Sequence, residues 1–230
     1  MKIKGLWRAM TGFERGLWIT SSVVVVVCYA LAPTGNILSL LSSLIGAAAL
    51  IFAAKGYVIG QVLSVIFAVL YGIISWEVRY YGEMITYLCM SAPIAVLSVI
   101  SWLRHPYKQS AEVKVHRLTG KQWLLLGGLT VAVTVAFYFI LGTLHTANLL
   151  VSTISVTTSF LAASLLQMRS PYYAVAYALN DIVLIVLWTL VIFVDSAALP
   201  MIVCFLMFLA NDIYGFYNWR RMQRRQLMDE

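Results

Sequence analysis

The chain has 230 residues, of which 62% are hydrophobic and only 11% are charged. A soluble protein of this length could not cover its surface with so few charges, so the composition excludes an ordinary water-soluble domain. Uncharged runs of about 20 residues recur along the chain, and each is long enough to cross the hydrocarbon core of a bilayer as a helix. The sequence therefore predicts an all-α polytopic membrane protein.

Eight apolar runs are bounded by charges, Gly or Pro, and we interpret all eight as helices because backbone groups in lipid must be satisfied within the segment. The predicted spans cover residues 17–32, 36–54, 57–76, 84–103, 122–142, 147–168, 172–193 and 197–218. Before the first span, residues 1–11 alternate apolar and basic side chains, which suits a short helix on the membrane surface or a disordered segment. In the fourth span, Pro93 should kink the helix, either as a hinge or as a static bend.

The basic residues predict the orientation of the chain. If the N-terminus is cytoplasmic, Arg79 alone among the 16 Lys and Arg falls in an outer loop, which is a strong positive-inside bias. Both termini are then cytoplasmic, and the cations at the span ends point to anionic lipid rather than nucleic acid as their partner. Trp102 and Trp219 are among the aromatic residues at span ends, and we interpret them as anchors in the headgroup region.

The chain looks internally duplicated. A shift of 116 residues superposes Ser39 on Ser155 and Leu50 on Leu166, and one more residue of slip brings Trp102 onto Trp219. Because the interval holds an even number of spans, the two copies should run in the same direction, as parallel repeats do. The predicted division is an N-terminal segment with an extra span (1–33), a first three-helix repeat (34–104), a cytoplasmic loop with a linker span (105–146), a second three-helix repeat (147–221) and a cytoplasmic tail (222–230).

Polar residues inside the spans need a function or a partner, since each costs free energy in lipid. In the seventh span, Asp181 shares a helical face with aromatic and amide side chains, and it either lines a cavity or hydrogen-bonds between helices. The third span carries a polar face that corresponds to it under the shift of 116, so both faces should converge on one lumen. In the last span we expect Asn211 to bind a neutral polar group and Asp212 to pair with Arg220 or Arg221. The substrate-binding candidates are Gln61, Ser64, Tyr71, Tyr177, Asn180, Asp181, Leu184, Trp188 and Asn211.

The hydroxyl groups of the sixth span, including Thr158 and Ser159, are interpreted as small residues that pack helices. No Lys, Arg or His lies at the central depth of any span, so an anionic substrate would have no cationic partner there. Aromatic rings with one or two acids instead suit a flat, positively charged ring. The sequence offers no nucleophile with a base, no metal cluster and no phosphate-binding loop, and neither a cofactor nor catalysis is expected.

Three features carry a resemblance to a known family: the Tyr81-Gly82-Glu83 turn, the Asn180-bearing seventh span and the closing NDIYGFYNW of residues 211–219. The chain resembles the PnuC-type vitamin transporters, most closely those for nicotinamide riboside, over residues 34–221. The resemblance implies a SWEET-like fold with a core of three, one and three helices, a homotrimer, and uptake of this precursor of NAD by facilitated diffusion in the bacterial inner membrane. It also implies that the nicotinamide ring is sandwiched near Trp188, Tyr177, Asn180 and Gln61.

The mechanism that follows is alternating access, in which the vitamin enters past Trp76 and Glu83, with Pro93 as a possible hinge. Relatives that carry thiamine or riboflavin would satisfy the same pattern, and Asp181 and Asp212 leave proton coupling open. An alternative of another class is an intramembrane enzyme on a lipid-linked substrate with these two acids as a carboxylate pair. That alternative requires both acids to face one pocket, whereas their predicted depths differ.

Overall fold

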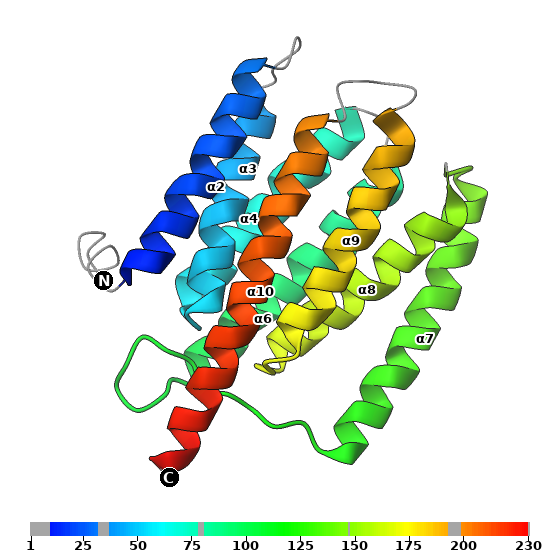
Figure 1. Cartoon of the computed structure of the whole chain (residues 1–230). Coiled ribbons are helices and arrows are strands. Elements are labelled where there is room, and N and C mark those ends of the chain that lie inside the picture. The colour runs from blue at the N-terminus through cyan, green and yellow to red at the C-terminus, as the bar shows by residue number, and fades with distance from the viewer. Residues whose placement is uncertain (1–9, 32–36, 78–80, 147, 193–198, 230) are drawn as a thin grey trace.

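The computed structural model of the chain describes residues 10–31, 37–77, 81–146, 148–192 and 199–229. Within these ranges, every secondary-structure element longer than an isolated bridge is a helix (Figure 1). The proposed surface helix of residues 1–11 falls almost entirely outside them. The helices are α2 (Gly12–Leu31), α3 (Ile37–Ala54), α4 (Val58–Glu77), α5 (Tyr81–Ile85), the π-helix η1 (Thr86–Ser91), α6 (Ala92–Arg104), α7 (Gly120–Thr143), α8 (Leu149–Gln167), α9 (Tyr173–Ile192) and α10 (Leu199–Met228).

Eight helical stretches in the described residues are long and apolar enough to cross a membrane, with α5, η1 and α6 forming one of them. The predicted all-α class and the eight spans are therefore confirmed. The largest boundary errors fall on α2 and α10. The first begins at Gly12, five residues before the predicted span, and the second continues to Met228, ten residues beyond it. Both extensions contain charged residues, which a search for uncharged runs necessarily leaves out.

Six of the spans close into a ring. Around the ring, α3 packs on α4, α4 on α6, α6 on α8, α8 on α9, α9 on α10, and α10 returns to α3. The triplets α3–α4–α6 and α8–α9–α10 run in the same directions (Figure 1), as expected for parallel repeats. They meet at two equivalent seams, because in each seam the third helix of one triplet packs on the first helix of the other. Outside the ring, α2 packs on α3 and α10, and α7 packs on α8.

The first helices of the two triplets end with the same backbone motif. Gly56 and Arg169 both have left-handed φ values, of 67° and 59°, and their N–H groups bond to the carbonyls of Ala53 and Leu166. The next N–H in each case, that of Tyr57 or Ser170, bonds five residues back, which completes a Schellman motif. These equivalent positions lie 113 residues apart, so the shift of 116 is one helical turn wrong for α3 and α8.

The span that contains Pro93 is interrupted rather than simply bent. A π-helical segment, η1, precedes α6, and Pro93 occupies the first turn of α6. The N–H of Ala92 bonds to the carbonyl of Tyr87, five residues earlier. Since proline cannot donate the bond that a continuous α-helix needs, the wider turn absorbs the break. Whether this position also moves as a hinge stays a prediction.

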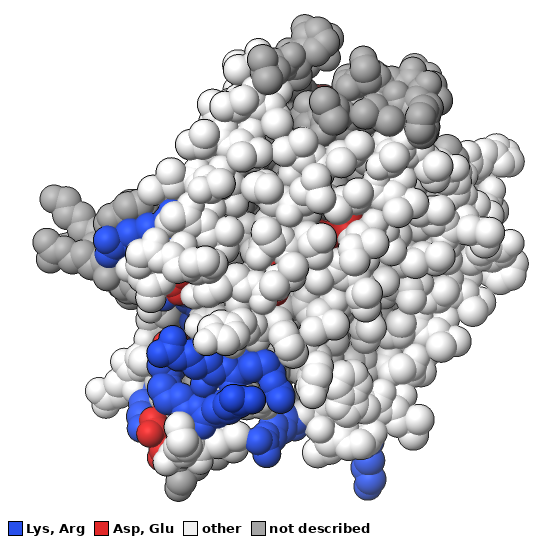
Figure 2. All heavy atoms as spheres, viewed as in Figure 1, with Lys and Arg blue, Asp and Glu red and all other residues white. Residues whose placement is uncertain are grey.

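Basic side chains gather at one end of the bundle, at the lower left of the face drawn in Figure 2. We call this the basic end; it is where α3, α6 and α8 finish and where the C-terminal part of α10 projects. The connection between α6 and α7 packs against that projection: the side chain of Gln226 donates to the carbonyl of Val113 and accepts from the N–H of Val115, and Arg225 pairs with Glu112. The charged extension of α10 is therefore part of the folded structure.

The interpretation of Trp102 and Trp219 as headgroup anchors is wrong. Their side chains are 1% and 0% exposed, and their ring centroids lie 5.5 Å apart, so they pack on each other inside the bundle. A tryptophan at a span end predicts a membrane interface only when its helix face points to lipid, and sequence position does not show which face that is. Trp123, which is 40% exposed, has the exposure of an anchor.

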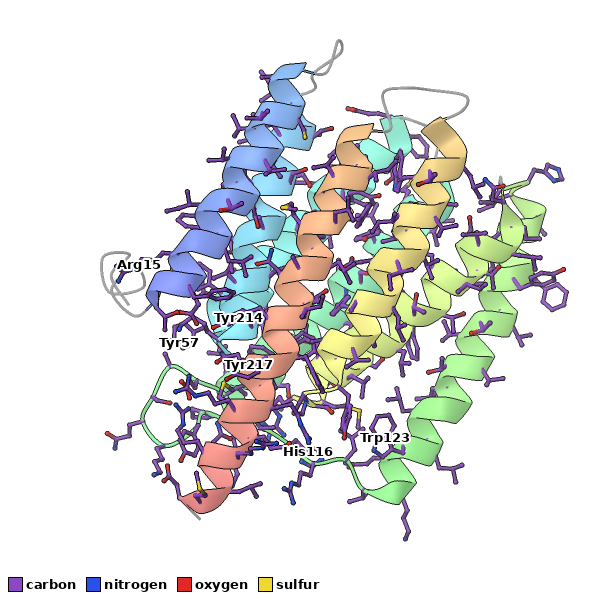
Figure 3. The ribbon with its side chains drawn as sticks, in the orientation of Figure 1. Arg15, Tyr57, His116, Trp123, Tyr214 and Tyr217 are labelled. Atoms are coloured by element: carbon purple, nitrogen blue, oxygen red, sulfur yellow. The ribbon has the colours of Figure 1, made fainter. Side chains whose placement is uncertain are left out.

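Glu14 fastens α2 to the ring. With Thr11 it forms a capping box, in which the Thr11 N–H donates to the carboxylate and the Glu14 N–H donates to the threonine hydroxyl. The same carboxylate accepts from Lys55 Nζ at 2.9 Å and from the Tyr214 hydroxyl at 2.7 Å. Figure 3 shows Tyr214 and Tyr217 on α10, and both line the groove that also contains Glu14 and Lys55. Glu14 is buried and Lys55 is largely shielded from solvent, with 2% and 11% of their side chains exposed.

We predict that Glu14→Ala lowers the melting temperature in detergent by about 6 to 12 °C, because it leaves the Lys55 ammonium buried without its partner, at a cost of about 3 kcal/mol. The measurement is tryptophan fluorescence during a thermal ramp. Glu112→Ala is the matched control, since it breaks the exposed pair with Arg225 and should cost less than about 1 kcal/mol. Equal losses in the two variants would contradict the assignment of Glu14 as the anchor of α2.

Candidate functional site

A cavity of about 100 Å³ lies inside the six-helix ring. Every ring helix contributes to its wall, as does η1, whereas α2 and α7 contribute nothing. Its polar lining residues are Gln61, Ser64, Tyr87, Ser91, Ser98, Ser159, Tyr173, Tyr177, Asn180, Asp181 and Asp212. The rest of the wall is made by glycine, aliphatic residues and phenylalanines, so the cavity combines apolar surface with polar groups, as small-molecule sites do.

The polar faces of the two triplets converge on this cavity, as the sequence predicts. Gln61 and Ser64 line it from α4, and Tyr177 and Asn180, their equivalents under the shift of 116, line it from α9. On α3 and α8 the lining residues correspond with a shift of 113, the same value as the helix-end motifs: Gly46 with Ser159, Leu50 with Ala163 and Ala53 with Leu166. The cavity therefore lies between two corresponding surfaces.

Gln61 is the polar residue whose environment most needs a ligand. Its side chain is 1% exposed, yet both its amide nitrogen and its amide oxygen are buried without a hydrogen-bond partner in the described structure. Burying a polar group without a partner costs about 1 to 3 kcal/mol, and natural proteins rarely keep such groups without a reason. Because Gln61 lines the cavity, its donor and acceptor are available there to a molecule that carries complementary groups.

Asn180 lines the cavity from the other triplet, and the carbonyl oxygen of its amide already has hydrogen-bond partners. Its Oδ1 accepts from the hydroxyls of Thr158 at 2.8 Å and Ser159 at 2.9 Å. With the carbonyl fixed in this way, the NH₂ group is the part of Asn180 that can contact a ligand. The hydroxyl groups that we interpreted as helix packing therefore also orient a cavity residue, and Ser159 itself lines the cavity.

The two buried acids meet, contrary to expectation. Asp181 and Asp212 both line the cavity, so two buried acids from neighbouring helices face the same space. The expected pairing of Asp212 with Arg220 or Arg221 is wrong: the Arg220 guanidinium donates to Gln223 and lies over the Tyr172 ring. Two neighbouring acids make this part of the cavity wall acidic, which favours a neutral or positive group there over an anion.

Three of the candidate binding residues do not line the cavity. Asn211 is on the other side of α10, where its amide donates to the Ser21 hydroxyl of α2 at 3.1 Å and to the Met207 carbonyl. Asn211 and Asp212 are neighbours in sequence, so their side chains leave a helix about 100° apart and face different surroundings. Tyr71 and Trp188 lie next to each other beyond the cavity wall, toward the end opposite the basic end. Leu184 does line the cavity.

The candidate gate residues occupy separate positions. Trp76 is 60% exposed near the end of α4, outside the cavity lining. Glu83 is buried, lies close to Tyr71 and Tyr87, and has one carboxylate oxygen, Oε2, without a hydrogen-bond partner. Pro93 is flanked by residues that line the cavity, Ser91 and Ile94, but does not line it. These roles therefore stay predictions.

An aromatic cluster that the sequence did not predict lines the part of the cavity away from the basic end. Phe67, Tyr87 and Phe208 line the cavity, and the rings of Tyr87 and Phe208 have their centroids 6.0 Å from that of Phe67. Tyr71 extends the cluster, with its ring centroid 4.3 Å from that of Tyr87. The sequence feature that could have indicated this cluster is the spacing of Gln61, Ser64 and Phe67, which places all three on one face of α4.

The cavity has a definite charge preference. Among the residues that the structure describes, its lining contains Asp181 and Asp212 but no Lys, Arg or His. In the described residues, no cluster of three or more His, Cys, Asp or Glu could hold a metal ion. A neutral or singly positive molecule can therefore enter without an unpaired buried charge, whereas a phosphate group would meet carboxylates and no cation.

A ring of six membrane-spanning helices around an acidic cavity, with no cation among its described lining residues, is the arrangement of a membrane carrier for a small molecule. The chain matches the family described as nicotinamide mononucleotide transporter over residues 36–221 and belongs to it. It is thus a multi-pass membrane protein of a transporter family.

Individual relatives agree with this family. The chain is 25% identical over 225 residues to the nicotinamide riboside transporter PnuC of Neisseria mucosa, covering 96% of this chain and 85% of the relative. It is 22% identical over 211 residues to the protein of the same name from Haemophilus influenzae, covering 91% and 90%. Among solved structures, it matches the crystal structure of the vitamin B3 transporter PnuC with a TM-score of 0.82 and 25% identity, over 95% of this chain and 94% of the other.

We predict that Gln61→Leu stabilises the protein in the absence of ligand, because it removes two buried groups without partners at similar side-chain volume. The melting temperature in detergent should rise by about 2 to 4 °C, equivalent to about 1 kcal/mol. Asn180→Leu is the matched control and should lower the melting temperature, since it removes the acceptor of the buried Ser159 hydroxyl and one of the acceptors of Thr158. A loss of stability in Gln61→Leu would mean that its amide has a structural partner.

Proposed function

We propose that the protein transports nicotinamide riboside, the vitamin B3 precursor of NAD, by facilitated diffusion with alternating access. The observation that carries the proposal is the buried, unpartnered amide of Gln61 facing the Asn180 amide across a cavity without cations. A nicotinamide ring carries a carboxamide with two donors and an acceptor, which matches two protein amides, and its positive charge suits a cavity lined by Asp181 and Asp212. Tyr177 and Tyr87 supply aromatic faces for the ring.

The cavity discriminates between two related ligands. The family description names the mononucleotide, whereas the relatives in Neisseria and Haemophilus are named for the riboside. The 5′-phosphate of the mononucleotide would enter a cavity whose described lining contains two carboxyl groups and no cation. Since an unpaired buried charge costs several kcal/mol, the unphosphorylated riboside is the better substrate.

The cavity volume favours a mechanism with moving walls. About 100 Å³ is less than the 300 to 1,000 Å³ typical of small-molecule sites, so the riboside fits only if the two triplets separate. The parallel arrangement provides two equivalent seams along which this rocking can occur. The basic end is the cytoplasmic one in this proposal, as the positive-inside rule predicts, with both termini on that side of the bacterial inner membrane. A homotrimeric assembly is proposed from the family resemblance alone.

Calorimetry with the purified protein tests the ligand. Nicotinamide riboside should bind more tightly than thiamine, and the 5′-phosphate should bind at least about 100-fold more weakly than the riboside, as expected for an uncompensated charge. Asn180→Ala and Gln61→Leu should each weaken riboside binding by about tenfold or more, the equivalent of one buried hydrogen bond to a charged or polar group.

Asn211→Ala provides the control for that experiment, because it removes an equivalent amide from the α2 side of α10 and should leave the affinity within about twofold. Tight binding of the phosphate would contradict the charge argument. Tighter binding of thiamine would redirect the assignment to another vitamin, and unchanged affinity in both cavity variants would remove the proposed site.

Transport of a cation without a coupling ion has an electrical signature. In proteoliposomes, an inside-negative potential should drive riboside accumulation, since one charge gains about 2.3 kcal/mol per 100 mV. We predict that a potassium diffusion potential supports uptake with no imposed pH gradient, and that a pH-sensitive dye inside records no acidification. Acidification in step with uptake would instead show that protons are cotransported, with Asp181 and Asp212 as the first residues to replace.

A further inference from the structure

Two pairs of neighbouring side chains bridge the seams of the ring at the basic end. On α6, Trp102 donates its indole N–H to the Leu166 carbonyl of α8 at 3.1 Å, and Ser101 donates its hydroxyl to the next carbonyl, that of Gln167, at 3.2 Å. The other seam repeats this arrangement. On α10, Trp219 donates to the Ala53 carbonyl of α3 at 2.9 Å, and the Asn218 amide donates to the Ala54 carbonyl at 2.8 Å.

The correspondence between the seams is exact in sequence. The donor dipeptides Ser101-Trp102 and Asn218-Trp219 are 117 residues apart, and the acceptor dipeptides Ala53-Ala54 and Leu166-Gln167 are 113 apart. In each seam the donors belong to the third helix of one triplet and the acceptors to the last turn of the first helix of the other. All four bonds therefore join the two triplets, and none lies within a triplet.

These bonds lie at the cavity boundary. Ala53 and Leu166, the two indole acceptors, both line the cavity, whereas the two indoles lie just beyond it. Their rings pack on each other at 5.5 Å, and Tyr173, which does line the cavity, packs edge-on against Trp219 at 5.0 Å. Trp102 and Trp219 come from opposite triplets, so a path from the cavity to the basic end between the triplets must separate these two rings.

We propose that Trp102, Trp219, Ser101 and Asn218 form the gate at the basic end. The gate is closed in this structure, and it opens when the four bonds break and the indoles part as the triplets rock. The assignment of these residues as a gate rests on the proposed transport function. Whether they close the path from the cavity to the basic end can be tested without any vitamin. The two equivalent pairs predict that loss of one seam weakens closure and that loss of both weakens it more.

The test measures how fast a cysteine in the cavity reacts from each side of the membrane. Ser98, which is 1% exposed and lines the cavity, is replaced by cysteine after Cys28, Cys89 and Cys204 are replaced by alanine. A membrane-impermeant cationic methanethiosulfonate reagent is then added to inside-out or right-side-out vesicles. Trp102→Phe with Trp219→Phe retains two aromatic rings and removes both indole donors.

We expect this double variant to react about tenfold faster than its parent from the basic end, and at an unchanged rate from the opposite end, as a population shift toward one open state requires. Each single variant should give an intermediate rate. Trp123→Phe is the control: Trp123 packs edge-on against Tyr172 at the same end but bridges no seam, and the reaction rate should match that of the parent.

The outcomes separate a gate from a merely structural contact. Ser101→Ala with Asn218→Ala gives a second, milder variant if the tryptophan variant fails to fold, and it should also speed the reaction from the basic end only. An unchanged rate in folded variants of both kinds would overturn the proposal, as would equal acceleration from both sides, which indicates general loosening. Riboside calorimetry on the parent is independent of these rates, so failure of the gate and failure of the transport assignment are distinguishable.

Discussion

The carbonyl groups at the end of a helix have no partner in their own helix, and in a membrane protein water is not freely available to replace it. At the ends of α3 and α8, two kinds of donor satisfy these carbonyl groups. A Schellman turn uses N–H groups of the following residues, and the indoles of Trp219 and Trp102 reach the carbonyls of Ala53 and Leu166 from the opposite triplet. The groups that complete each helix end thus also join the two halves of the ring at the boundary of the cavity.

The large-scale fold could be predicted because it depends on average properties. Eight apolar runs and one-sided basic charge require only that lipid excludes charges and unpaired backbone groups. The convergence of Gln61 and Ser64 with Tyr177 and Asn180 was also predictable, since equal positions in parallel repeats must face the same axis. The register of α3 against α8 was not, because a shift of three residues nearly restores the same helical face and the sequence similarity does not choose between the two.

The individual errors have one cause. Asn211 and Asp212 are adjacent, and a search for polar groups treats both as candidates, yet one contacts Ser21 on α2 and the other lines the cavity. Trp102 and Trp219 lie at span ends like ordinary anchors, but their faces point to the seams. In each case the chemistry of the residue was clear from sequence, and the direction of its side chain depended on the packing of α2 and of the opposite triplet. That packing is a long-range property of the fold.

Hydrogen-bonded and unpartnered polar groups occupy different parts of the ring, and this distinguishes residues that hold the triplets together from residues that can bind a ligand. At the basic end, Trp102, Trp219, Ser101 and Asn218 all have partners, and these partners hold the triplets together. In the cavity, Gln61 has none, and Asn180 keeps its NH₂ group free while two hydroxyls fix its carbonyl. A ligand that bonds to both Gln61 and Asn180 links α4 to α9, which belong to different triplets. Binding therefore strengthens the contact between the triplets at the level of the cavity, so the bonds that hold them together at one end can be released without separating the halves completely. This division of bonds between ligand and gate is what alternating access requires of a carrier built from two rocking triplets.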